Sequence, residues 1–364
     1  MTTRLALAMA LSLGLAAPAF ADAAPSTSAT QAANPFFAES TLPLHYPAFD
    51  KIADSDFAPA FEAGMKQELE QVEAIANNKA PATFDNTIIA LENSGAIMDR
   101  AMTVFSALAG ADTNYTRKAL QTQYATKFAA HRDAIGLNGK LFARIAALYE
   151  TRTALGLDAE GVRLIERYYE NFERGGAKLS EADKAKVRAI NSELAELGAK
   201  FNLNVLNEVN SSFVVVDDVA QLAGLSEGQI AATAEAAKAR NLDGKYVIAL
   251  LNTTGQPLLS NLANRELRQK LYEASVNRGA KGGQFDNTAL VSRIMTLRAE
   301  KATLMGHPNF AAYGLGNQTA KTPEAVNAML RQLAPAAVAN AQREAADLQA
   351  MIDAEQKSAG QPSF

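Results

Sequence analysis

Apolar side chains recur at three- and four-residue intervals along most of the sequence, which is the spacing of one face of an α-helix. The first such run contains Phe61, Met65, Leu69, Val72 and Ile75, with charged and polar residues between them. This pattern predicts an amphipathic helix whose apolar face packs against other helices.

The longest regular run begins at Ser180. The hydroxyl of Ser180 is a typical N-cap, and Asp183 three residues later makes an approximate capping box. The apolar stripe that follows continues without a break and predicts a long helix in a helical array. Its members are Val187, Ile190, Leu194, Leu197, Phe201 and Val205.

Shorter helical patterns are bounded by turn signals. We predict helices over 83–91, over 96–109, from 264 onward and over 287–305. Thr322 followed by Pro323 predicts a further helix start, because a hydroxyl caps the helix and proline suits its first position. That helix extends to about residue 357. One of its faces contains Leu330, Leu333, Ala337, Ala341, Ala345 and Leu348.

The middle of the chain changes its pattern. Residues 212–216 and 245–250 are β-branched or aromatic runs bounded by turn residues, and they predict a small strand pair. An alanine-rich helix over 226–240 is expected between them. The fold class is therefore mainly α, with a small strand insertion. We expect a helical region over 34–210, a strand-containing segment over 211–260 and a second helical region over 261–358, followed by linker composition over 359–364.

The N-terminus has the three parts of a secretory signal peptide. A positive start with Arg4 precedes an apolar run from Leu5, and Ala19-Phe20-Ala21 fits the cleavage pattern. The apolar run is too short to span a membrane. We predict a signal peptide over 1–21, cleaved after Ala21, and a disordered polar leader over 22–33. The expected location is the periplasm.

Composition excludes several kinds of chemistry. The chain of 364 residues has no Cys, which excludes disulfides and thiolate metal sites. A net charge of −4 argues against binding to nucleic acid by phosphate neutralisation. The three histidines of the chain are His45, His131 and His307. None of them is followed by Glu, so an H-E-x-x-H zinc site is absent from this sequence.

Each histidine has a structural explanation. We expect His45 in an extended segment, His131 on a solvated helix face and His307 in a helix-ending turn. The Gly-rich stretch 279–284 lacks the order of a phosphate-binding loop and predicts a flexible turn. Asp217 and Asp218 predict a strand-end turn.

Other polar groups are equally weak as candidates for catalysis. We expect no base close to Ser211, Ser212 or Ser226, and none of them has a G-x-S-x-G setting. A basic set could bind a carboxylate, but solvation or pairing with nearby Glu is the commoner outcome. The set is Arg265, Arg268, Arg278, Arg293 and Arg298, and the nearby acids are Glu266, Glu273 and Glu300.

An ordered series of motifs resembles the thimet-oligopeptidase family of zinc metallopeptidases. The N-terminal motifs are PAF at 47–49, FEAGM at 61–65 and PATFDNTIIALENSG at 81–95. They are followed by NRELR at 264–268, LYEA at 271–274, Arg278, DN at 286–287, LRAEKA at 297–302 and LMGHPNFAAY at 304–313. The resemblance covers about 34–358, and the predicted signal peptide favours the bacterial peptidyl-dipeptidase branch.

The resemblance implies one lobe of a two-lobed helical ellipsoid with a deep channel. Members hold zinc by the two His of H-E-x-x-H and a Glu on the next helix, and the motif Glu activates the zinc-bound water. No residue here matches a zinc ligand or the general base. We therefore predict no catalytic, cofactor-binding or metal residues in this chain and no zinc bound by it.

Two hypotheses follow. The first is the N-terminal half of an exported zinc peptidyl-dipeptidase, inactive as given, whose complete form is a monomer that releases dipeptides from the C-termini of short peptides. The second is a non-catalytic exported helical protein that binds peptides or a partner. We favour the first.

Overall fold

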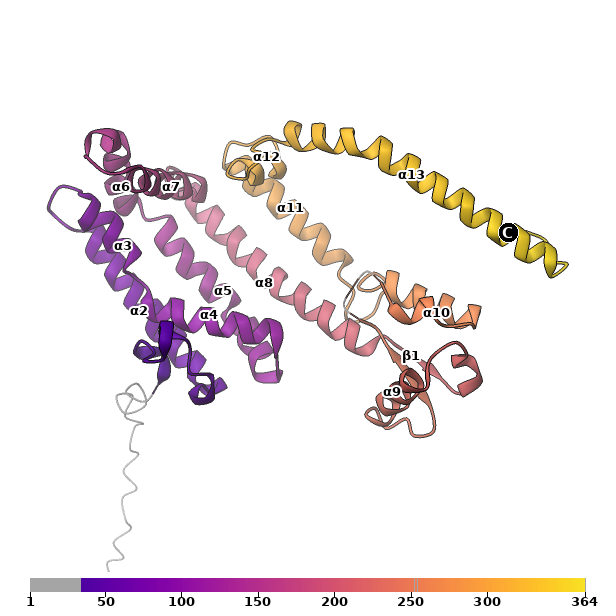
Figure 1. The fold of residues 1–364 in the computed structure, drawn as a ribbon. Helices are drawn as coiled ribbons and strands as arrows, with labels where there is room; N and C mark the ends of the chain where they lie inside the picture. Colours follow the sequence, from indigo (N-terminus) through magenta and orange to yellow (C-terminus); the bar gives the residue numbers. More distant parts are fainter. Residues whose placement is uncertain (1–33, 252, 254, 364) are drawn as a thin grey trace, which may run out of the picture.

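The computed structural model describes residues 34–251, 253 and 255–363. The predicted signal peptide over 1–21 and leader over 22–33 lie outside the described residues. Helices make up most of the described chain, and the described residues also form one two-stranded sheet (Figure 1). The prediction of a mainly α fold with a small strand insertion is confirmed.

The α-helices follow one another along the chain. They are α2 (Phe57–Ala76), α3 (Ala90–Glu92), α4 (Ala96–Ala111), α5 (Tyr115–Gly136), α6 (Gly139–Thr151), α7 (Ala159–Gly175), α8 (Glu181–Ser211), α9 (Glu227–Lys238), α10 (Arg265–Val276), α11 (Thr288–Leu304), α12 (Phe310–Leu315) and α13 (Pro323–Ser358). A π-helical turn, Phe84–Ile89, leads into α3. Short 3-10 helices are Pro35–Phe37, Pro43–His45, Phe49–Lys51, Asp54–Asp56, Arg152–Ala154, Val219–Leu222 and Pro257–Ser260.

The long helix α8 runs through the middle of the molecule (Figure 1). It begins at the predicted cap, where the Ser180 hydroxyl accepts a hydrogen bond from the Asp183 amide at 3.2 Å. Helix α5 packs along one side of α8 and α11 along the other. The predicted apolar stripe is fully buried only at its start, at Val187 and Ile190.

Three apolar clusters form the core. The first is an aromatic cluster between α2, α4 and α5, and the second joins α2 to α6 and α7. The third lies under the sheet and includes Leu267 and Leu271 of α10. The predicted face of α2 supplies the first two clusters, with Phe61 and Met65 in one and Val72 and Ile75 in the other.

The sheet consists of β1 (Phe213–Val216) and β2 (Tyr246–Ala249), both within the predicted runs. The strands are antiparallel, with Val216 opposite Tyr246 and Phe213 opposite Ala249. Helix α9, capped by Ser226, lies in the connection and packs against β2. The sheet and α9 sit at the C-terminal end of α8 (Figure 1).

The buried phenol of Tyr124 makes the aromatic cluster sensitive to alkali. Its hydroxyl donates to the Glu62 carboxylate at 3.0 Å, and burial, followed by this bond, raises the pKa of Tyr124 to about 12. An unfolded Tyr titrates near 10, so the folded state holds this proton more tightly. The resulting stability is complete below about pH 10 and is lost as the pH rises toward the folded pKa.

We therefore expect Tyr124→Phe to lose less stability than the wild type between about pH 9 and about pH 11. Thermal unfolding followed by circular dichroism across this range would measure the difference. Tyr115→Phe is the matched control, because the Tyr115 side chain is 87% exposed, and it should follow the wild-type curve. Parallel curves for all three proteins would contradict the prediction.

Candidate functional site

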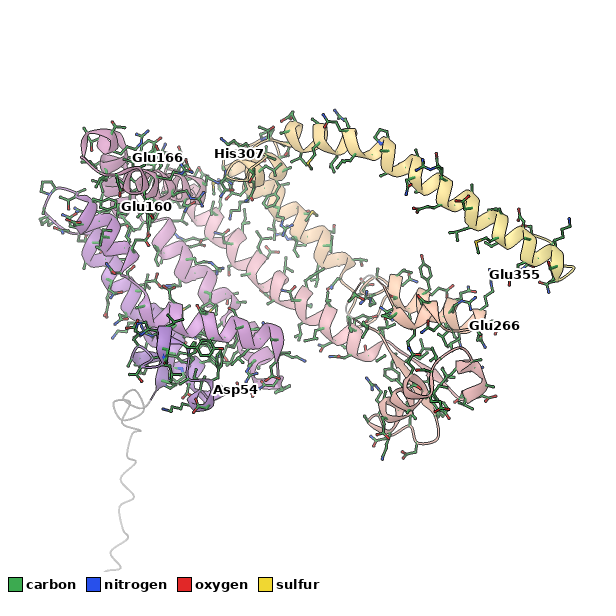
Figure 2. The ribbon with its side chains drawn as sticks, viewed as in Figure 1. Asp54, Glu160, Glu166, Glu266, His307 and Glu355 are labelled. Carbon is green, nitrogen blue, oxygen red and sulfur yellow. The ribbon has the colours of Figure 1, made fainter. Side chains whose placement is uncertain are left out.

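Two of the three histidines lie at turns on the surface. His45 ends a short 3-10 helix with a left-handed φ of 55°, so the prediction of an extended segment was wrong there. His307 follows Gly306 after α11, as predicted, and its ring packs edge-on against Tyr313. Figure 2 shows His307 near α12, well separated from Asp54 and Glu266.

His131 is buried, and the prediction that it lies on a solvated helix face was wrong. It is 7% exposed, and its Nε2 lies 2.7 Å from Oε2 of Glu68 on α2. Its Nδ1 is buried without a hydrogen-bond partner. The helical period does carry this signal, because His131 continues the spacing of the buried Leu120, Tyr124 and Phe128 on α5. The prediction considered only its polar neighbours in the sequence.

The described residues do not fit a zinc site. In 34–251, 253 and 255–363, no group of three or more His, Cys, Asp or Glu side chains is placed to hold a metal ion. His131 Nε2 pairs with Glu68 Oε2, and no third ligand among the described residues joins them. No catalytic step through zinc can therefore be derived from these residues.

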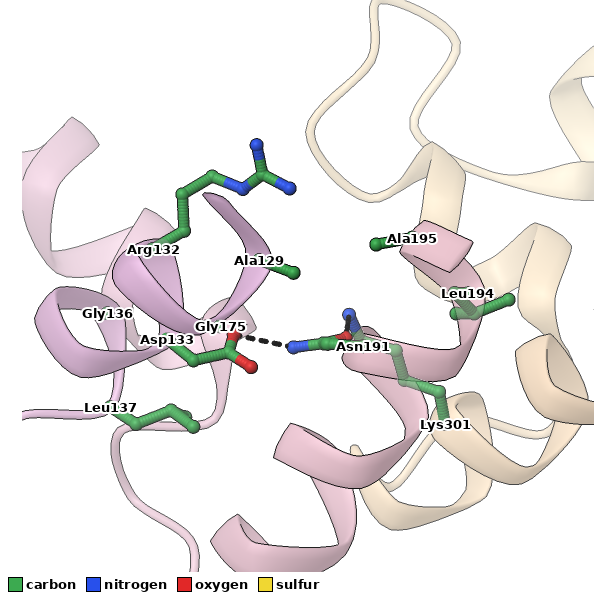
Figure 3. A pocket seen from close by; sticks show the side chains of 10 residues that line it. All are labelled: Ala129, Arg132, Asp133, Gly136, Leu137, Gly175, Asn191, Leu194, Ala195 and Lys301. Atoms are coloured by element: carbon green, nitrogen blue, oxygen red, sulfur yellow. Dashed lines mark hydrogen bonds between the residues drawn. The ribbon is translucent and has the colours of Figure 1, made fainter. Parts of the chain in front are cut away.

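A polar cleft lies between α5, α8 and α11 (Figure 3). Its floor is a chain of two hydrogen bonds. Asn191 Nδ2 donates to Asp133 Oδ1 at 2.7 Å, and Lys301 Nζ donates to Asn191 Oδ1 at 2.6 Å. Arg132 stands at the rim. The cleft has a volume of about 470 Å³, and the remaining lining residues are Ala129, Gly136, Leu137, Gly175, Leu194 and Ala195.

Burial disfavours the charged forms of Asp133 and Lys301, the two ends of this hydrogen-bonded chain. It raises the pKa of the Asp133 carboxyl, although the Asn191 hydrogen bond and the charges of Lys301, Arg132 and Arg188 oppose this shift. Burial lowers the pKa of the Lys301 ammonium. The charge of Asp133 opposes this shift, and the charge of Arg132 adds to it. Arg132 therefore acts on both groups, and the cleft contains more positive than negative charge.

The sequence pattern did not predict this cleft. Asp133, Asn191 and Lys301 are 58 and 110 residues apart along the chain. Each lies in a helical pattern among other polar residues, so no local spacing marks it. Only the packing of α5 and α11 on either side of α8 brings the three side chains together.

A second polar group ties the Gly-rich stretch to α8. Lys281 Nζ lies 2.7 Å from Glu208 Oε1 and donates to Ser212 Oγ at 2.7 Å, while Ser212 donates to Glu208 at 2.9 Å. The predicted turn at 279–284 is present, with positive φ at Gly279, Gly282 and Gly283. The prediction that Ser212 has no nearby base was wrong, because Glu208 Oε1 accepts a hydrogen bond from its hydroxyl.

The remaining candidates have structural roles. Ser226 caps α9, Asp218 caps the Val219–Leu222 turn, and Asp217 pairs with Lys245 at 2.8 Å, as a strand-end turn predicts. The Ser211 hydroxyl donates to the Glu208 carbonyl.

The basic set does not converge on one site. Arg293 forms a bidentate pair with Glu193 and lies 3.9 Å from Glu300. Arg268 and Arg278 donate to backbone carbonyls, and Arg298 lies over the ring of Phe310. These arginines are therefore occupied in holding local structure. Arg265 also makes an interaction.

Helix α13 leaves the body of the molecule after α12, and none of its residues is buried (Figure 1). The apolar face of α13 is defined as Val326, Leu330, Leu333, Ala337, Ala341, Leu348 and Met351. Leu333 and Leu348 are each 60% exposed and Met351 is 69% exposed. An apolar face of this length marks a surface that binds another protein surface.

We expect the isolated chain to self-associate through the apolar face of α13. Leu333→Glu with Leu348→Glu should give a monomer by size-exclusion chromatography with light scattering, since charges disfavour burial of this face. Ala339→Glu with Ala350→Glu adds the same charge to exposed positions on the opposite side of the helix and should leave the association intact. A monomeric wild type would contradict the prediction.

No described helix is both long and apolar enough to cross a membrane.

Comparison with known proteins identifies relatives along most of the chain. The model of "Peptidase family M3" matches residues 258–363. Dipeptidyl carboxypeptidase of Escherichia coli (strain K12) is 44% identical over 323 residues, which are 89% of this chain and 47% of that protein. Its counterpart in Salmonella typhimurium (strain LT2) is 40% identical, over 89% of this chain and 48% of that protein.

A more distant relative is oligopeptidase A of Escherichia coli (strain K12), 26% identical over 86% of this chain and 46% of that protein. The chain thus spans about half the length of the curated relatives it matches. These matches confirm the resemblance drawn from the motifs. The chain belongs to peptidase family M3.

Proposed function

We propose that this chain is the N-terminal part of an exported zinc metallopeptidase that releases dipeptides from the C-termini of short peptides. The observation that supports this most directly is the 44% identity to a dipeptidyl carboxypeptidase across 89% of the chain. The helical architecture suits the proposed role as one wall of a channel that admits short peptides and excludes folded proteins.

In the proposed enzyme, the catalytic zinc is held by residues other than those described here. This is consistent with the lack of a fitting ligand group among the described residues. The chain alone should therefore neither hydrolyse a blocked tripeptide nor retain stoichiometric zinc. Chelator-sensitive hydrolysis by the purified 364-residue chain would overturn this part of the proposal.

The proposal can be tested at the gene. The source DNA read past the Phe364 codon should encode H-E-x-x-H, in the same frame or after a frameshift. The product that includes this segment should release dipeptides from a peptide with a free C-terminus and lose activity with a chelator. An intact stop codon with no such motif in any frame would overturn the proposal.

The apolar face of α13 is explained in the proposed enzyme as a surface that packs against the rest of the peptidase. In the alternative, a partner-binding protein, a separate partner would cover it. In the full-length enzyme this face is covered and the protein is a monomer. Its partners are short peptides, with no role for nucleic acid or for a membrane after export.

Export is the part of the proposal that depends on the first residues. The pattern over 1–21 supports secretion to the periplasm with cleavage after Ala21. N-terminal sequencing of protein from the periplasmic fraction should begin at Asp22. A protein that retains Met1 and stays in the cytoplasm would count against export without affecting the peptidase assignment.

A further inference from the structure

The cleft between α5, α8 and α11 contains cations that the described protein leaves unpaired. Neither Arg132 nor Lys301 forms a salt bridge with a described residue, and Lys301 Nζ lies 6.0 Å from the centroid of the Tyr313 ring. Lys301 donates one hydrogen bond to Asn191, and an ammonium group has three N–H donors. The Arg132 guanidinium makes no hydrogen bond to a described side chain or carbonyl and stands at the rim (Figure 3).

Asp133 is the one carboxylate among the described residues that line the cleft, and it makes no direct ion pair with Arg132 or Lys301, although both charges act on it. Its Oδ1 accepts from Asn191, which stands between it and Lys301. Two cations against one carboxylate leave the cleft with an excess positive charge. Half-burial strengthens this charge for any ligand that enters, because the local dielectric is lower than in water.

The walls of the cleft are apolar and small. Ala129 and Ala195 face each other across its mouth, and Leu137 and Leu194 line its sides (Figure 3). A volume of about 470 Å³ accommodates a short peptide end, which is within the range of small-ligand pockets. The cleft therefore combines a cationic edge with an apolar enclosure.

We infer that this cleft binds the C-terminal carboxylate of a short peptide. The carboxylate accepts hydrogen bonds from the Arg132 guanidinium and the free donors of Lys301, and the last side chain lies against the alanine and leucine walls. A singly charged carboxylate suits the site better than a phosphate dianion, because Asp133 repels added negative charge. The peptide nature of the ligand rests on the proposed function, while the carboxylate chemistry rests on the cleft.

Titration calorimetry on the 364-residue chain tests this inference. The probe is N-acetyl-Ala-Ala with a free carboxylate, compared with N-acetyl-Ala-Ala-amide, which has the same shape without the charge. We expect the acid to bind saturably and the amide to bind at least about tenfold more weakly, as expected for loss of a charge-assisted contact. Equal binding of acid and amide, or tighter binding of inorganic phosphate than of the acid, would overturn it.

Two variants of the cleft test where the acid binds. Arg132→Gln and Lys301→Gln should each weaken binding of the acid by about tenfold and leave amide binding unchanged. Arg163→Gln is the matched control, because Arg163 is an exposed arginine on α7 paired with Glu166 and Glu170. Circular dichroism shows whether each variant is folded, and the acid-to-amide comparison on the wild type does not depend on any variant.

The inference and the proposed function fail separately. Absence of carboxylate selectivity in this chain would remove the binding site and leave the zinc peptidase proposal standing. Absence of H-E-x-x-H from the gene would remove the peptidase, while selective binding of the acid would still establish a carboxylate site. Unchanged affinity in folded Arg132→Gln and Lys301→Gln would place any binding elsewhere and overturn the inference.

Discussion

Phe61→Ala should lower the free energy of unfolding by about 3–5 kcal/mol, the usual cost of removing a fully buried phenylalanine. The Phe61 ring is 0% exposed and lies at the centre of the aromatic cluster. Its centroid is 5.2 Å from that of Phe105, 5.1 Å from Tyr124 and 5.0 Å from Phe128. Because these rings come from α2, α4 and α5, the cavity would loosen three helices at once.

Urea denaturation followed by circular dichroism measures the effect. Tyr115→Ala is the control, since it removes an aromatic ring that is 87% exposed and should change stability by less than about 0.5 kcal/mol. A Phe61→Ala protein as stable as the control would mean that the aromatic cluster does not organise the N-terminal helices.

Gly224→Ala should destabilise the chain by about 3 kcal/mol or more, through backbone strain and a clash. Gly224 has φ +94°, and a Cβ built on it would lie 2.0 Å from the carbonyl oxygen of Asn261. Relief requires the backbone at Asn261 to move. The adjacent hydrogen bond from the Ala263 amide to the Ala223 carbonyl, now 2.8 Å, would then break.

Gly244→Ala separates the clash from the strain. Gly244 has a similar φ of +78°, but nothing lies within 4 Å of its added Cβ. We expect a cost of about 1 kcal/mol there, from the left-handed conformation alone. Hydrogen exchange at the Ala263 amide should quicken in Gly224→Ala only. Equal losses of stability in the two variants would show that Asn261 accommodates a side chain freely.

Local structure was predictable because its causes are local. Apolar spacing set the face of α2, and hydroxyl caps set the starts of α8 at Ser180 and of α13 at Thr322. The cap at Ser180 departs from a full capping box, because Asp183 bonds the Ser180 hydroxyl and not its backbone. Both strands formed where β-branched residues were concentrated, each a residue or two shorter than predicted.

The candidate sites were not predictable, because they depend on contacts between distant segments. His131 continues the buried stripe of Leu120, Tyr124 and Phe128 on α5, but its spacing does not reveal that Glu68 of α2 pairs with it. Glu208 lies one helical turn before Ser212, so that contact is local, but Lys281 reaches both side chains from a distant segment that the sequence pattern does not place there. A side chain's environment is set by the elements packed over it, which a single helical period does not specify.

The sequence by itself determined the helices, the strand pair, the lack of an H-E-x-x-H motif and the family, since each of these is written in local spacing or ordered motifs. Only the tertiary structure decided which polar groups meet. It placed Asp133, Asn191 and Lys301 in one cleft because α5 and α11 flank α8. It also left the apolar face of α13 exposed, because no described element packs along that helix and burial is a property of neighbours, not of spacing.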